Sequence, residues 1–142
     1  ILASKLHEEV KALLQEMYPN ALIQEEVPIR VSGRNLRLDL LVDYPFNIAV
    51  EVQGKQHDEF VPFFHGDMTG FRDYQRRDRF KETWCWEHSI ALVYVYEHEK
   101  LTKEILQRKI EQAERLLDQA FEREGERENI RKRGKARDFE RE

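Results

Sequence analysis

Two acidic residues, Asp39 and Glu51, lie within two apolar runs, residues 36–42 and 47–53, that predict a β-hairpin around a Tyr-Pro turn. Side chains alternate between the two faces of a strand, so the apolar residues at positions 38, 40 and 42 are expected to share one face and to leave Asp39 on the other. A hairpin centred on the proline places Asp39 directly opposite Glu51, with Cβ atoms roughly 4.5–5.5 Å apart.

Two carboxylates at this separation repel each other unless a positive charge lies between them. A divalent cation is the usual partner, and hard oxygen ligands of this kind suit Mg²⁺. Gln53 is expected on the same face as Glu51, where its carbonyl oxygen could ligate the ion or orient a water. The pattern therefore predicts a magnesium site with Asp39 and Glu51 as ligands. The alternative is a pair of surface carboxylates on a half-exposed hairpin.

The segment that follows the second run adds further groups suited to hydrolysis. The chain leaves the expected strand through a glycine and then carries Lys55, His57 and Asp58. The unperturbed pKa of histidine is about 6.5, which suits proton transfer near neutral pH. A histidine after a strand is more often structural, but its place behind the Asp/Glu hairpin favours a catalytic role for His57.

The order of an Asp, a short hairpin and then Glu-Val-Gln-Gly-x-x-His resembles the core of the PD-(D/E)xK nuclease superfamily. Within it, the chain is similar to the very short patch repair (Vsr-like) endonucleases and the related EDxHD homing endonucleases. The Arg-Asp-Arg-Phe-Lys run at 77–81 and the strand expected at 90–96 follow that group's order, and the resemblance covers roughly residues 5–98.

The resemblance implies a restriction-endonuclease-like α/β fold and a Mg²⁺-dependent endonuclease that cuts double-stranded DNA, with Mn²⁺ as a substitute metal. A divalent ion supplies a water of lowered pKa and stabilises charge on the phosphoryl oxygens. The resemblance also casts His57 as a histidine that assists catalysis near the metal, and Asp58 completes an arrangement like the xHD motif.

Two departures from the family patterns are visible in the sequence. The usual lysine of (D/E)xK is Gln53 here, so Lys55 or Lys81 would have to supply positive charge from a shifted position. The cysteine-based structural zinc site of typical Vsr proteins is also missing, because Cys85 is the single cysteine. This second departure favours the homing-endonuclease side of the resemblance. Cys85 itself, between two tryptophans, is expected in the core.

The first helix is expected over residues 3–18, with an apolar stripe on one side. At about 100° per residue, Glu8 points away from the stripe and Glu9 lies on its flank. Many enzymes of the resembling superfamily place a glutamate of this helix at the metal, which makes Glu9 the candidate. A solvated glutamate is the alternative. A strand is then expected over residues 21–27, with Pro28 ending it or marking a sheet edge.

A second helix, expected over residues 71–88, carries the strongest run of basic side chains in the expected folded part of the chain. Phosphate contacts position a nuclease without specifying sequence. The candidate DNA-binding residues are Arg72, Arg76, Arg77, Arg79, Lys81 and, from the preceding segment, Lys55. A solvated face balanced by the acidic residues of the same helix is the alternative. Arginines at 30, 34 and 37 add positive charge near the site.

The remaining segments carry weaker signals. Residues 59–69 are rich in aromatic side chains, which indicates either a loop that contacts DNA or a hydrophobic plug under a loop. His65 and Asp67 in this segment are two potential metal ligands, too few for a site by themselves. A third helical stripe ends near residue 121. Residues 122–142 are charged, so they predict a helical extension or a tail, with a basic stretch able to bind nucleic acid electrostatically.

The composition bounds the remaining possibilities. A chain of 142 residues with 40% hydrophobic content is long enough for one domain, here residues 1–121. It has no apolar run of about 18 residues, so no membrane partner is expected. The net charge of −4 does not indicate a dedicated nucleic-acid binder, but a local basic patch could dock a substrate. A lone cysteine suits a reducing cytoplasm.

The sequence therefore predicts a mixed, mainly antiparallel sheet flanked by helices, with a long C-terminal helix, and an endonuclease encoded by a bacterium or a phage. The chain starts at Ile1, without a Met, so we expect a fragment or a processed product. No zinc finger or clear helix-turn-helix pattern is visible, and we expect the target-recognition region of a larger protein to lie outside this chain. The oligomeric state is open, and a dimer is one option. One alternative is a non-catalytic DNA-binding or assembly module on a degenerate nuclease fold. Another is a nuclease for RNA or branched DNA.

Overall fold

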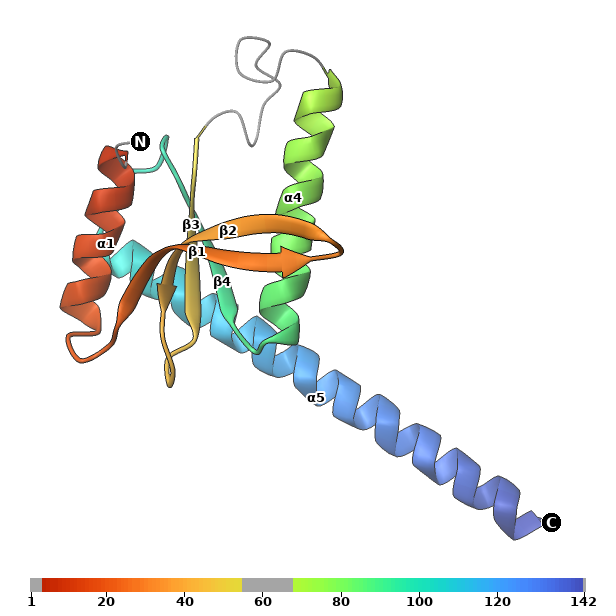
Figure 1. The fold of residues 1–142 in the computed structure, drawn as a ribbon. Helices are drawn as coiled ribbons and strands as arrows, with labels where there is room; N and C mark the ends of the chain where they lie inside the picture. The colour runs from red at the N-terminus through yellow and green to blue at the C-terminus, as the bar shows by residue number, and fades with distance from the viewer. Residues whose placement is uncertain (1–3, 55–67, 142) are drawn as a thin grey trace.

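The computed structural model describes the backbone of residues 4–54 and 68–141 and the side chains of residues 4–54 and 75–134. Figure 1 shows the order of the elements along the chain. They are α1 (Lys5–Met17), β1 (Ile23–Val31), β2 (Arg34–Val42), β3 (Ile48–Gln53), α4 (Met68–Glu87), β4 (Ala91–Tyr96) and α5 (Lys103–Arg141).

The strands form one sheet in the order β1-β2-β3-β4 within the described part of the chain. β1, β2 and β3 are antiparallel, and β4 runs parallel to β3 after the crossover through α4. This confirms the predicted mixed sheet flanked by helices. The β2–β3 pairs Leu40↔Val50 and Val42↔Ile48 also confirm the register that a turn centred on the proline predicts.

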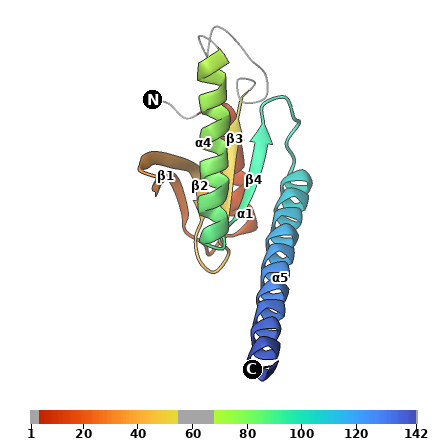
Figure 2. The same ribbon diagram turned by 90° about the vertical axis from the view of Figure 1, so that its right-hand side faces the viewer.

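Helices cover both faces of the sheet, and Figure 2 shows α4 and α5 on opposite sides of it. α1 and α5 pack on one face, where the buried residues are Val10, Leu14, Leu40, Val42, Ile48, Val50, Val93, Val95, Leu106 and Ile110. α4 packs on the other, where they are Ile29, Val31, Leu38, Ala49, Cys85 and Ile90. Burial of these side chains from water is the main force that holds the layers together.

The expectation that positions 38, 40 and 42 share one face is wrong for Leu38. Leu38 packs in the α4 cluster, whereas Leu40 packs in the α1–α5 cluster. The change of face occurs at Asp39, opposite Glu26, which has a φ of 49°. Two-stranded ribbons twist more strongly than wide sheets. Beyond this point the β1–β2 ribbon curves across α4 (Figure 1), so its inner side chains meet the helix.

The observed ends of α1 and β1 have local physical causes. α1 begins at Lys5 because Ser4 caps it, its Oγ accepting a hydrogen bond from the His7 N–H at 3.1 Å. β1 does not end at residue 27 but continues through Pro28 to Val31. Proline is tolerated there because β1 is an edge strand, the second of the two expected readings.

The C-terminal helix α5 is 39 residues long and extends away from the body of the protein (Figure 1). Its first turns are buried through Leu106 and Ile110, and residues 122–134 are exposed. Residues 122–142 were expected to form either a helical extension or a tail, and in the structure they continue α5 as far as Arg141. Within the described residues, none of the helices is both long and apolar enough to cross a bilayer.

Candidate metal and nucleic-acid site

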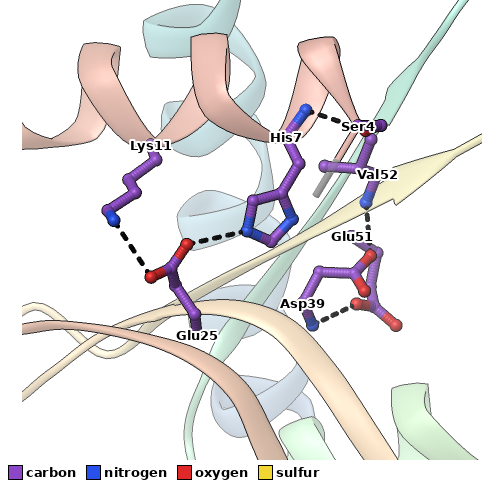
Figure 3. Close-up of polar contacts among 7 residues, drawn as sticks. All are labelled: Ser4, His7, Lys11, Glu25, Asp39, Glu51 and Val52. Atoms are coloured by element: carbon purple, nitrogen blue, oxygen red, sulfur yellow. Dashed lines mark hydrogen bonds and ion pairs between the residues drawn. The ribbon is translucent and has the colours of Figure 1, made fainter. Parts of the chain in front are cut away.

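The side chains of Asp39 and Glu51 form hydrogen bonds between β2 and β3 just beyond the last backbone-paired residues. The Asp39 N–H donates to Oε2 of Glu51 at 2.8 Å, and the Val52 N–H donates to Oδ2 of Asp39, also at 2.8 Å (Figure 3). The last ladder pair is Leu40↔Val50, so each carboxylate takes a backbone N–H of the neighbouring strand in place of the next ladder bond. The two carboxylates meet across the strands, as the hairpin register predicts.

Lys81 of α4 completes this cluster from the helix side. Its Nζ lies 2.6 Å from Oε1 of Glu51, and the two side chains are only 17% and 3% exposed. Burial, and secondly the nearby Asp39 carboxylate, raises the pKa of Glu51 to about 7, while Lys81 opposes this shift. Two roles were expected for Lys81, phosphate binding on the helix face and supply of positive charge from a shifted position. In the structure its ammonium pairs with the buried Glu51 carboxylate.

Gln53 and Tyr94 extend the polar face between the sheet and α4. Gln53 is buried, and its Nε2 donates to Oδ2 of Asp78 at 3.2 Å. Tyr94 lies beside Glu51 in the parallel β3–β4 register. The Tyr94 hydroxyl donates to Oε1 of Glu82 at 2.6 Å, and burial raises the pKa of Tyr94. Asp78, Glu82 and Tyr94 were not predicted as site residues from the sequence. The helical spacing of Asp78 and Lys81 was the one available signal that they share a face.

A groove of about 730 Å³ opens beside Asp39, between the β1–β2 ribbon and α4. Four basic side chains line it against two acidic ones, so its electrostatics favour a polyanion. The lining residues are Glu26, Arg34, Asn35, Leu36, Arg37, Asp39, Arg77 and Lys81. Among the candidate DNA-binding residues, Arg77 and Lys81 lie in this groove. Arg76 and Arg79 are exposed on α4, and the side chain of Arg72 lies outside the described residues.

The expectation that Glu9 looks toward the sheet is wrong, because its side chain is exposed. The buried polar residue of α1 is His7, which is 5% exposed and lies 3.0 Å from Oε1 of Glu25. His7 joins Val10 and Leu14 in the buried stripe, which turns the stripe away from Glu9. No role was predicted for His7 from the sequence.

His7 also belongs to a second cluster, on α1 and β1. Among the described residues, His7, Glu8 and Glu25 have ligand atoms close enough to hold a cation. The ammonium of Lys11 lies 3.0 Å from Oε2 of Glu25. Figure 3 draws this pair beside His7. Lys11, and secondly His7, lowers the pKa of Glu25. Glu25 of this cluster is therefore already paired with an ammonium group.

Several predicted residues lie outside the described part of the chain. They are Lys55, His57 and Asp58, the His65–Asp67 pair and most of the aromatic segment 59–69. The described site thus consists of Asp39, Glu51, Gln53 and Lys81.

Comparison with known proteins adds two partial relatives. The chain is 34% identical over 67 residues to "Uncharacterized protein 307L" of Invertebrate iridescent virus 6, covering 45% of this chain and 34% of that protein. It is 34% identical over 65 residues to "Uncharacterized protein 033L" of Invertebrate iridescent virus 3, covering 46% and 33%. The matched part spans about a third of each relative. No protein-family model and no solved structure matches the chain.

Proposed function

We propose that this chain is a metal-dependent DNA endonuclease domain that hydrolyses phosphodiester bonds in double-stranded DNA, of the Vsr-like or homing kind. The observation that carries the proposal is the meeting of Asp39, Glu51 and Lys81 at the end of the β2–β3 ladder. Two carboxylates and one lysine are the charged groups of a (D/E)xK site. The lysine comes from α4 and not from the strand, which accounts for Gln53 at the usual lysine position.

The donor set fits a hard divalent cation, Mg²⁺ with Mn²⁺ as a substitute. Asp39 and Glu51 offer carboxylate oxygens from adjacent strands, and Glu51 is buried beside a like charge. A cation would relieve both the burial of that charge and the repulsion from Asp39. Bound there, it would lower the pKa of a water and stabilise charge on the phosphoryl oxygens.

The chain's own groups have separate tasks in this proposal. The Val52 N–H fixes the orientation of Asp39, and the Asp39 N–H fixes that of Glu51. Lys81 places a positive charge beside Glu51, where the phosphoryl oxygens gain charge in the transition state. The basic groove holds the phosphate backbone next to Asp39. By the family resemblance, His57 transfers a proton.

A second candidate is a non-catalytic DNA-binding or assembly module. One observation favours it: each carboxylate of the cluster already has an N–H or ammonium partner. A network satisfied in this way can act as a structural clasp between β2, β3 and α4. The exposed half of α5 could then serve assembly.

The deciding experiment is cleavage of supercoiled plasmid with Mg²⁺, with Mn²⁺ and with EDTA. The variants are Asp39→Asn and Glu51→Gln, and the matched controls are Asp118→Asn and Glu104→Gln, exposed acids on α5. The proposal predicts metal-dependent nicking or linearisation that both site variants lose and both controls keep. Cleavage by the site variants at the wild-type rate contradicts the nuclease proposal. Absence of cleavage, together with no calorimetric Mg²⁺ or Mn²⁺ binding, favours the structural clasp.

A further inference from the structure

The β1–β2 ribbon projects beyond the rest of the sheet. Among the described strands, β3 pairs with β2 only at Leu40–Val42, whereas β1 and β2 stay paired from Val27↔Leu38 to the turn at Val31↔Arg34. At the turn, Ser32 and Gly33 have φ values of 50° and 77°, as a two-residue hairpin loop requires. The distal half is thus a two-stranded arm (Figure 1).

One face of this arm is anchored on α4. Ile29, Val31 and Leu38 are buried in the cluster that Phe80 and Trp84 of α4 pack against. The guanidinium of Arg34 lies 5.3 Å from the centre of the Phe80 ring, a cation–π contact across the same interface. These contacts cover the inner face of the arm and leave its other face toward solvent.

The outward face of the arm is polar, basic and exposed. It consists of two cross-strand pairs, Pro28↔Arg37 and Arg30↔Asn35, and all four side chains are exposed. A hollow of about 370 Å³ lies along it, lined in part by these residues. Arg30 and Asn35 are directly opposite each other near the tip. Arg37 lies nearer the base, on the side of Asp39.

This face continues into the groove of the candidate site. Asn35, Leu36 and Arg37 line both the hollow on the arm and the larger groove. Asp39 and Lys81 are among the lining residues of the larger groove. A polyanion that occupies both hollows therefore lies next to the carboxylate cluster.

We propose that residues 28–37 form the DNA-recognition arm of this chain, inserted into the major groove of a duplex. Arg30 and Asn35 contact base edges, and Arg37 contacts the backbone. This inference rests on the proposed function only in taking double-stranded DNA as the substrate. A two-stranded ribbon fits the major groove of B-DNA, where arginine pairs with guanine and asparagine with adenine. The narrow major groove of A-form RNA does not admit such an arm.

The experiment measures binding without cleavage. Fluorescence anisotropy in EDTA follows binding of a labelled duplex selected by the wild type from a randomised pool. The variants are Arg30→Ala, Asn35→Ala and Arg37→Ala, and the control is Arg108→Ala, an exposed arginine on α5. All four positions are exposed, so the thermal unfolding midpoint is expected to stay near that of the wild type.

The variants are expected to differ in kind. Arg30→Ala or Asn35→Ala should weaken binding of the selected duplex by about 5- to 150-fold and relax preference at one position. Arg37→Ala should weaken binding to duplexes of every sequence by the same factor. It should also reduce the magnitude of the slope of log K against log salt by about one, because one phosphate contact is lost. Arg108→Ala should bind like the wild type.

The outcomes separate this inference from the nuclease proposal. If the wild type cleaves plasmid but the arm variants bind with wild-type affinity and salt slope, the recognition arm is wrong and the nuclease stands. If the arm variants lose binding while the wild type never cleaves, the arm stands and the nuclease is wrong. Equal wild-type affinity for a double-stranded RNA of the same sequence would also overturn the arm.

Discussion

The ammonium of Lys81 lies 2.6 Å from the carboxylate of Glu51, although the two residues are 30 positions apart in the chain. The same carboxylate accepts the Asp39 N–H from the neighbouring strand. Glu51 therefore joins three elements, β2, β3 and α4, at one buried point. An ion pair in this position links α4 to the sheet and contributes to the charge of the candidate site.

Replacing Lys81 by methionine should destabilise the fold in a pH-dependent way. The change leaves Glu51 buried without its cation, which costs about 3 kcal/mol when Glu51 is ionised. The loss should be large near pH 8 and smaller near pH 5.5, where Glu51 holds a proton. Urea unfolding in EDTA measures it.

The control for this change is Lys103→Met. Lys103 pairs with Glu16 at 3.0 Å, but both side chains are exposed, so its loss should cost under about 1 kcal/mol. An equal loss for Lys81→Met at both pH values would contradict the assignment of the pair as buried and charged.

The stability of the metal-free protein should fall as pH rises through the titration of Glu51. Burial and Asp39 raise its pKa from 4.5 to about 7. Between these values the folded state keeps a proton that the unfolded state loses, so stability falls with rising pH there, by roughly 1–3 kcal/mol in all, and levels off above.

Other carboxylates, such as Glu25, titrate in part of this range, so the quantity to measure is the difference between the wild type and Glu51→Gln. Chemical unfolding from about pH 4 to pH 8 in EDTA gives it. A difference that stays constant with pH would show that the pKa of Glu51 is not raised.

Moving the lysine from the helix back to the strand should restore part of the proposed activity. Lys81→Met is expected to slow metal-dependent plasmid nicking by about 100-fold, because it removes charge beside the phosphoryl group. Adding Gln53→Lys places an ammonium on the same face of β3 as Glu51, within reach of Asp78, and should recover about tenfold. The double variant Lys81→Met/Gln53→Met is the control. No recovery with lysine at position 53 would argue against a shifted catalytic lysine.

Two leucines of α5 should respond very differently to truncation. Leu106 has no exposed surface and packs in the α1–α5 cluster, so Leu106→Ala should cost about 2–5 kcal/mol. Leu116, six residues beyond Ile110, is 60% exposed, and Leu116→Ala should change the free energy of unfolding by less than about 0.5 kcal/mol. Denaturant unfolding monitored by circular dichroism compares them. Similar losses would mean that the outer part of α5 also packs against the body.

The sequence by itself determined the elements and the register of the central hairpin. Alternation in two short runs and a proline between them predicted Leu40↔Val50 and the meeting of Asp39 with Glu51. These features depend on neighbours within about ten residues, where strand periodicity and turn chemistry act directly. The strand β4 was also predicted, from a near-continuous apolar run that is typical of a strand buried on both faces. In the structure only alternate residues of β4 are fully buried.

Only the tertiary structure decided which side chains from distant elements meet. It turned Glu9 outward and His7 inward, and it moved Leu38 to the α4 face through the twist of the ribbon. It also brought Lys81 to Glu51 and set the arm of residues 28–37 beside the groove. These relationships depend on how α4 crosses the sheet and how far the ribbon coils. Both are set by packing the whole core at once, and no local sequence pattern encodes them.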